Sequence, residues 1–178
     1  MSLFRILTVC TANICRSPMV ELLLRQRLEP EIFEVASAGV QGWREASVDS
    51  MVVLELERLG VSAEGFCSRA LEPQMAEDAD LILTATRDQR SELLSRYPSA
   101  LRRTFTLREF AVLVEDMIGV TSPAEMVAEA FRRRSEAGAD LDLVDPFRRP
   151  PDVHRAVADQ IAEAVRIVAE RLSVTVQH

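Results

Sequence analysis

Short apolar runs alternate with amphipathic helical patterns along most of the chain, and this alternation limits the possible folds more than any other feature. The apolar runs have the length of buried strands and occur at 3–9, 32–39, 79–86 and 103–107. The helical patterns that follow them cover 17–28, 49–59, 87–97 and 108–117. Strands that alternate with helices predict an α/β fold, in which helices cover both faces of a parallel sheet.

The last third of the chain adds two further helices. Ser122 and Glu125 have the spacing of a capping box and predict a helix that ends near Gly138. A long helix after the loop at 139–152 closes the chain. Its apolar residues share one face: Val157, Ile161, Val165, Val168 and Leu172.

Length and composition predict one domain, spanning 1–178, because 178 residues with 48% hydrophobic content suffice for one core. A net charge of −7 argues against a nucleic-acid partner or a polybasic membrane surface. The sequence has no apolar stretch of membrane-spanning length and no signal-peptide pattern, so we expect a cytoplasmic protein without membrane insertion. Three cysteines and two histidines predict neither a disulfide framework nor a structural metal site.

The loop between the first strand and the first helix has the features of a phosphate-binding site. Backbone amides at 11–16 precede the predicted helix start at Ser17 and Pro18, and amides at a helix start bind anions. Cys10 begins the loop and Arg16 ends it, so a curled loop would place the sulfur under a phosphate and the guanidinium on its oxygens. These positive groups favour a thiolate at Cys10.

A less specific interpretation exists for each of these residues. A cysteine at a strand end is often a small buried hydrophobe, and Ser17 is equally expected as the side-chain cap of the helix. The pattern C-x5-R-S between an apolar strand and a Ser-Pro helix start meets several demands of phosphate binding together. We therefore favour a catalytic Cys10.

The stretch VCTANICRSP resembles the loop V-C-x-G-N-I-C-R-S-P of the low-molecular-weight protein tyrosine phosphatases. Further matches follow in the family's order, namely SAGVQGW (37–43), SRAL (68–71), ADLILT (79–84), FTLREFA (105–111) and DPF (145–147). The resemblance implies a Rossmann-like, three-layer α/β/α fold. Its four parallel strands would have the order 2-1-3-4, with the phosphate loop between strand 1 and helix 1.

The resemblance also implies the chemistry. Cys10 would attack the phosphorus of a phosphotyrosine protein to form a cysteinyl-phosphate intermediate, without metal or cofactor. Asp145 would give a proton to the leaving group and later take one from the attacking water. Arg16 would hold the phosphoryl oxygens.

The remaining site residues would bind substrate or shape the loop. Ser17 would bond the Cys10 sulfur, and Asn13 would hold the curl of the loop in a left-handed conformation. Cys15 is either a packed thiol or a partner for Cys10 in a protective disulfide. The loop residues that would surround phosphate or a similar oxyanion are Thr11, Ala12, Asn13, Ile14 and Cys15. The residues that would form the walls around a phenyl ring are Ile14, Trp43 and Phe147.

The chain departs from the family pattern at several positions. Ala12 replaces the usual Gly and would be strained if its φ were positive, and Phe66 replaces a histidine that supports the loop. Ala85 and Thr86 replace a Met-Asp pair, Arg148 replaces an aromatic residue, and the helical segment around 118–138 is extra.

Three other functions stay open. Arginine phosphatases share the loop but carry Thr where this chain has Ile14, which disfavours that activity. An arsenate reductase would need an external thiol, because the chain has no cysteine after Cys67. The departures at Ala12 and Phe66 are also compatible with a weakened phosphoprotein-binding module.

Overall fold

A parallel sheet of four strands forms the centre of the computed structural model, which describes residues 3–42 and 45–176. Within these residues the strands lie in the order β2-β1-β3-β4, which confirms the expected topology. The strands are β1 (Phe4–Cys10), β2 (Phe33–Gly39), β3 (Leu81–Thr84) and β4 (Thr104–Thr106). The α-helices are α1 (Arg16–Arg27), α2 (Ser50–Arg58), α3 (Pro73–Asp78), α4 (Arg87–Arg96), α5 (Leu107–Glu115), α6 (Pro123–Arg132) and α7 (Pro151–Val174). Two 3-10 helices, η1 (Pro98–Arg103) and η2 (Arg134–Glu136), complete the elements.

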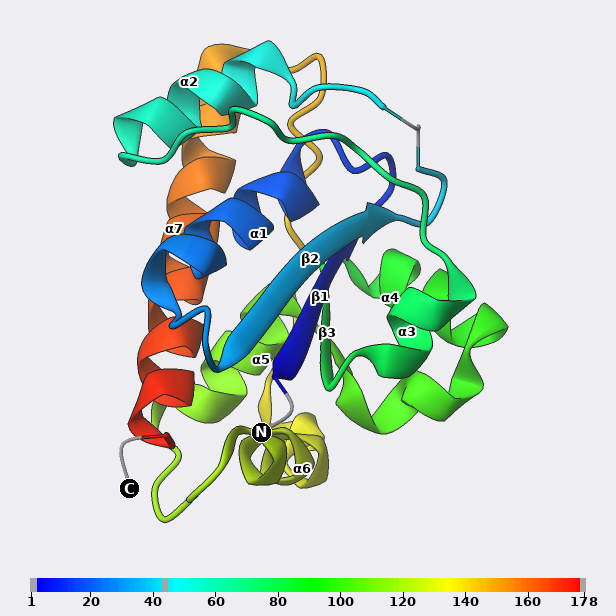
Figure 1. The fold of residues 1–178 in the computed structure, drawn as a ribbon, viewed down its shortest axis with the longest axis vertical. Helices are drawn as coiled ribbons and strands as arrows, with labels where there is room; N and C mark the ends of the chain where they lie inside the picture. The colour runs from blue at the N-terminus through cyan, green and yellow to red at the C-terminus, as the bar shows by residue number, and fades with distance from the viewer. Residues whose placement is uncertain (1–2, 43–44, 177–178) are drawn as a thin grey trace.

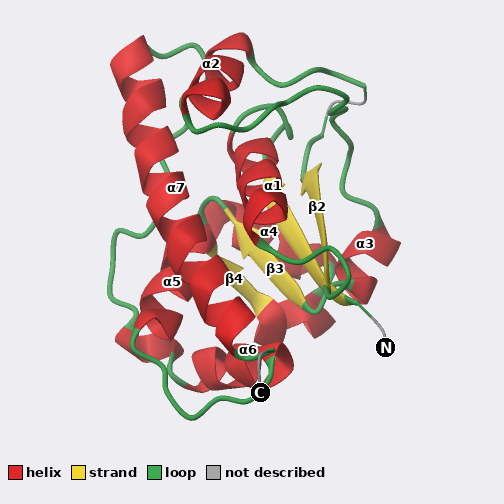
Figure 2. Cartoon of the chain, turned by 60° about the vertical axis from the view of Figure 1, so that its left-hand side comes forward, coloured by secondary structure: helices red, strands yellow, loops and turns green. Residues whose placement is uncertain are grey.

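Helices cover the sheet on both faces (Figures 1 and 2). Helices α1, α5 and α7 pack on one face, where the larger hydrophobic cluster includes Phe105, Phe110 and Leu113. Helices α3 and α4 lie on the other face over a smaller cluster that includes Ile82 and Leu93. Helix α2 packs against α7 beside α1. Burial of apolar side chains on both faces is the main stabilising contribution.

The register of the sheet brings the loop after β1 to the carboxyl edge. Cys10, the last residue of β1, is paired with Gly39 at the end of β2. The pairing continues past the strands, because Val40 N donates to Cys10 O at 2.9 Å and Gln41 N donates to Thr11 O at 2.9 Å. The loop thus starts from a backbone that is held by its neighbour, at the edge where open α/β sheets bind ligands.

The structure corrects the expected elements at several places. Helix α3 and η1 have no periodic apolar pattern and were not predicted. Helix α6 ends at Arg132 and is followed by η2, so the helix is shorter than the expected one. Ser122 does cap α6, but the Glu125 carboxylate accepts from the N–H and hydroxyl of Thr121 at 2.9 Å and does not complete the expected capping box.

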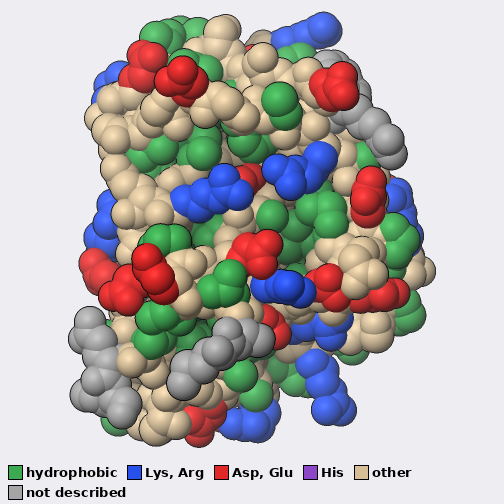
Figure 3. Space-filling view, in the orientation of Figure 1, with side chains coloured by type: hydrophobic (Ala, Val, Ile, Leu, Met, Phe, Trp, Pro, Cys, Tyr) green, Lys and Arg blue, Asp and Glu red, His purple; other side chains and the backbone are tan. Residues whose placement is uncertain are grey.

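Charged side chains of both signs are interspersed on the face of the molecule drawn in Figure 3. None of the helices in the described ranges combines the length and apolar character needed to cross a membrane.

Candidate active site

The sulfur of Cys10 lies at the base of the loop, where β1 ends. Cys10 is buried, and its Sγ is 3.0 Å from Ser17 Oγ. The side-chain amide of Asn13 donates to the same Ser17 oxygen at 2.9 Å, so the single hydroxyl proton of Ser17 is shared between the sulfur and Ala38 O, which lies 3.5 Å away. Ser17 is therefore placed to stabilise negative charge on Cys10.

The predicted helix cap at Ser17 is wrong. Helix α1 begins at Arg16, the residue that precedes it is Cys15, and no side chain caps the helix. Ser17 lies inside the first turn, where its hydroxyl is used by the loop. Uncapped amides at a helix start are donors available to an anion.

Asn13 holds the curl of the loop, as expected. Its φ of 61° is left-handed, a conformation that Asn tolerates better than most residues. Its side chain is fully buried, donates to Ser17 and to Ser37 Oγ (2.8 Å), and accepts from the Arg69 amide (2.8 Å). One side chain thus ties the loop to α1, to β2 and to the segment after Cys67.

This network contains a buried carboxylate that sequence reasoning missed. Ser37 donates to Glu21 of α1, which is fully buried and also forms an ion pair with Arg25 at 2.7 Å. The network makes no use of Phe66, the residue at the family's histidine position. A charged residue within the apolar stretch MVELLL was the available signal for Glu21.

Ala12 is not strained. The described non-glycine residues with positive φ are Asn13, Glu45, Asp140 and Arg148, so Ala12 does not have the positive φ that would have strained it. Gly39, by contrast, is a position beside the loop that requires a glycine. A Cβ there would lie 2.6 Å from Thr11 O and 2.9 Å from the Ala12 carbonyl carbon.

Arg16 is buried and joins the loop to the segment that carries Asp145. Its Nη1 donates to Leu143 O at 2.9 Å, and its Nη2 lies 3.6 Å from Asp145 Oδ1. Its Nε is buried and has no hydrogen-bond partner among the described residues. An unpartnered buried guanidinium N–H is costly, and a bound group that accepted from it would remove this cost.

Asp145 lies at the rim of the site with its side chain 61% exposed. Its Oδ1 accepts from Phe147 N at 3.2 Å, which fixes the carboxylate on the side of Arg16. Arg148 has a left-handed φ of 58°, and its guanidinium lies 5.1 Å from the centre of the Phe147 ring. The carboxylate is thus accessible and is oriented by its own turn.

A cavity of about 220 Å³ brings most of the predicted residues together. Gln41, which sequence reasoning did not single out, joins them because β2 continues alongside the loop. Trp43 lies outside the described residues. The residues that line the cavity are Cys10, Thr11, Ala12, Ile14, Cys15, Arg16, Gln41, Asp145 and Phe147.

The second cysteine of the loop, Cys15, is buried near a negatively charged side chain. Burial, reinforced by the negative charge of Asp49, raises the pKa of the Cys15 thiol well above its ordinary value. Asp49 caps α2 through Met51 N, and its own amide donates to Ile14 O at 2.9 Å. Cys15 is therefore a neutral thiol at physiological pH.

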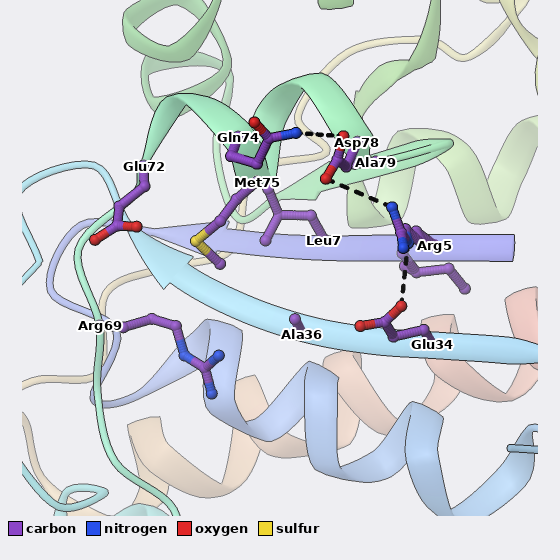
Figure 4. Close-up of a pocket in the computed structure, with 11 residues that line it drawn as sticks. Arg5, Leu7, Glu34, Ala36, Arg69, Glu72, Gln74, Met75, Asp78 and Ala79 are labelled. Carbon is purple, nitrogen blue, oxygen red and sulfur yellow. Dashed lines mark hydrogen bonds and ion pairs between the residues drawn. The ribbon is translucent and has the colours of Figure 1, made fainter. Parts of the chain in front are cut away.

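A larger cavity, of about 350 Å³, lies over β1 and β2 beside α3 (Figure 4). Its floor is apolar around Leu7 and Met75, and Arg5 forms ion pairs with Glu34 and Asp78 at one end. None of its lining residues lines the cavity at Cys10. It holds no combination of nucleophile and acid, so it is not the candidate active site.

Known proteins share this architecture, an α/β fold in which the loop from Cys10 to Arg16 joins β1 to α1. The profile of the family described as low molecular weight phosphotyrosine protein phosphatase matches residues 5–136. The chain belongs to this family.

Relatives within the family carry two kinds of name. A protein-arginine-phosphatase of Geobacillus stearothermophilus is 33% identical over 171 residues, covering 95% of this chain and 96% of the relative. The low molecular weight protein-tyrosine-phosphatase Etp of Escherichia coli K12 is 30% identical over 168 residues, covering 94% of each. The solved structure of the YwlE arginine phosphatase from G. stearothermophilus superimposes with a TM-score of 0.78 at 29% identity, covering 98% of this chain and 97% of that one.

Proposed function

We propose that this protein hydrolyses phosphotyrosine in proteins through a phosphate ester on Cys10. The observation that carries the proposal is the pairing of a cysteine sulfur with an arginine at the start of a helix. Cys10 and Arg16 line the same cavity, and the buried Nε of Arg16 has no hydrogen-bond partner among the described residues. Phosphate or a similar oxyanion in the loop would accept from this Nε and from the loop amides. The proposed location is the cytoplasm, where cysteine thiols stay reduced.

In the first step, the Cys10 thiolate attacks phosphorus, and the bond from phosphorus to the tyrosine oxygen breaks. Asp145 gives its proton to that oxygen, so tyrosine leaves as a neutral phenol. Arg16 and the loop amides stabilise the charge of the equatorial oxygens as it is redistributed. The Asp145 carboxyl is accessible at the rim and is held toward Arg16 by the Phe147 amide, which supports this role.

In the second step, water attacks the cysteinyl phosphate and the bond from sulfur to phosphorus breaks. The Asp145 carboxylate takes a proton from the water, and inorganic phosphate is the product. The sulfur leaves as a thiolate, which the Ser17 hydroxyl stabilises from 3.0 Å. No metal or cofactor takes part in the proposed steps.

The walls of the cavity favour an aromatic substrate. The buried Ile14 and the half-buried Phe147 both line the cavity, together with Asp145. Apolar walls around a polar base select a flat ring that carries phosphate at its far end. Phosphoserine is too short to span such walls.

Hydrolysis of phosphoarginine is the second candidate, because a relative with that name covers nearly the whole chain at 33% identity. The two substrates differ beside the phosphate, where phosphoarginine carries guanidinium N–H groups that need acceptors. Ile14 has none to offer. A threonine at this position would add a hydroxyl acceptor.

A pair of phosphopeptides with the same flanking sequence tests the choice. We expect kcat/KM for the phosphotyrosine peptide to exceed that for the phosphoarginine peptide, and Ile14→Thr to shift the ratio about tenfold toward phosphoarginine. Ile14→Val is the matched control, because it changes volume without adding a hydroxyl. A wild-type preference for phosphoarginine would reverse the substrate assignment. Binding of both peptides without turnover would instead favour a phosphoprotein-binding module.

A further inference from the structure

The side-chain amide of Gln89 occupies a buried position between two parts of the site. Gln89 lies in the first turn of α4 and is 5% exposed. Its Oε1 accepts from Ala85 N at 3.1 Å and from Thr86 N at 3.0 Å. Backbone amides can only donate, so these two contacts fix which end of the side-chain amide faces them.

The other end of the amide therefore faces the phosphate loop. Nε2 of Gln89 donates to Thr11 Oγ1 at 3.1 Å. Thr11 follows Cys10 directly and lines the cavity. Because Nε2 has no lone pair to offer, Thr11 accepts in this contact and its rotamer is set from outside the loop.

The segment that Gln89 holds also carries the contact to Arg16. Ala85 O accepts from Leu143 N at 2.9 Å, and Leu143 O accepts from Arg16 Nη1 at 2.9 Å. A continuous set of hydrogen bonds thus runs from Thr11 through Gln89, Ala85 and Leu143 to Arg16. It links both ends of the loop to the segment that leads to Asp145.

We propose that Gln89 is a positioning residue of the active site, which fixes Thr11 and, through Ala85 and Leu143, the guanidinium of Arg16. It touches no reacting atom. Small displacements of a group that binds the transition state cost much activity, so an amide that holds two such segments at once affects rate more than folding. This inference rests on the proposed function for its kinetic consequence, but its binding consequence is independent of turnover.

Gln89→Met, which keeps the volume and removes every polar contact, tests the proposal. We expect kcat for an aryl phosphate to fall about tenfold, and the dissociation constant of inorganic phosphate, measured by calorimetry, to rise at least about threefold. Thr106→Ala is the matched control for lost helix capping, since Thr106 forms the same type of capping box on α5. We expect this control to leave both quantities within about twofold of wild type.

Gln89→Glu is the conservative variant. One carboxylate oxygen can still accept from Ala85 and Thr86, while the other accepts from the Thr11 hydroxyl, so the links persist. Its negative charge beside the loop disfavours phosphate, so we expect kcat below that of wild type but at least about threefold above that of Gln89→Met. The proposal is overturned if Gln89→Met matches Thr106→Ala in both quantities, or if Gln89→Glu is as impaired as Gln89→Met. A wild-type protein that binds phosphate without hydrolysing aryl phosphates would contradict the proposed function, while the phosphate affinities would still test Gln89.

Discussion

Arg16 and Asn13 depend on partners that come from distant parts of the chain. Arg16 is held by Leu143 and Asp145, which lie more than a hundred residues further on. Asn13 is held by Ser37 and Arg69. The sequence motif brings the nucleophile and the cation together, but the long-range contacts orient them.

The role proposed for Asp145 predicts a dependence on the leaving group. A proton donor matters most when the departing oxygen is basic, so Asp145→Asn should slow phenyl phosphate about a hundredfold and p-nitrophenyl phosphate much less. Steady-state kcat values over a series of aryl phosphates measure this. Equal slowing across the series would remove Asp145 from the role of acid.

The raised pKa of Cys15 predicts a loss of stability at alkaline pH. The folded chain keeps the proton at pH values above the ordinary 9.0, where the unfolded chain loses it. The contribution is therefore constant below that pH, and stability falls as pH rises above it. Urea unfolding of wild type and Cys15→Ala at about pH 7 and about pH 10 measures the difference.

Cys15→Ala should lose less stability than wild type between the two pH values, whatever its stability at neutral pH. Cys67→Ala is the control, because that thiol is exposed and should leave the wild-type pH dependence intact. The same pH dependence in all three proteins would show that Cys15 is not its source.

Residues within one local motif could be assigned from the sequence, and residues that act across the fold could not. The left-handed conformation of Asn13 and the proximity of Cys10 to Arg16 follow from one short segment. Glu21 and Gln89 are held by partners on other elements; the charge within the apolar stretch MVELLL sets Glu21 apart, but no local pattern marks Gln89 as part of the site. Whether Ala12 is strained depends on its φ angle, and the sequence alone does not determine that angle.

At the scale of elements, the loop depends on the close approach of β2. Gly39→Ala would place a Cβ 2.6 Å from the carbonyl oxygen of Thr11, and backbone cannot move aside as a side chain can. We expect a loss of about 1–3 kcal/mol of stability together with loss of aryl phosphate hydrolysis. Chemical denaturation and kcat measured on the same samples test both.

A substitution at a second glycine is the control that separates a loss of stability from a loss of activity. Gly65 has a φ of 76°, and a Cβ added there would have no atom within 4 Å, so Gly65→Ala should cost stability by backbone strain alone. Its kcat should stay at the wild-type value. If Gly39→Ala were as active as Gly65→Ala, the loop would not depend on this contact.

The long periodic elements were predictable, and the short or aperiodic ones were not. The strands and α1, α2, α4, α5 and α7 have apolar patterns that match their period. Helix α3 has six residues with one buried side chain, Ala76, and η1 likewise buries one, Ala100. Such short elements owe their conformation to tertiary packing. The Glu125 carboxylate accepts from the N–H and hydroxyl of Thr121 and not from the Ser122 amide that a capping box would use.

For the whole molecule, the strand order places β1 between β2 and β3, so the loop after β1 has neighbours on both sides. Helix α7 packs against α1, α2 and α5 and closes the larger core. Despite a net charge of −7, the cavity gathers Arg16 and the amides at the start of α1. Anion binding is thus a local property of one edge of the sheet.

Hydrolysis of p-nitrophenyl phosphate in the presence of EDTA, by wild type and Cys10→Ser, tests the central claim most directly. We predict that wild type is active and that Cys10→Ser loses essentially all activity while still binding inorganic phosphate. Absence of hydrolysis by wild type, abolition of it by EDTA, or undiminished hydrolysis by Cys10→Ser would contradict a metal-independent mechanism with Cys10 as the nucleophile.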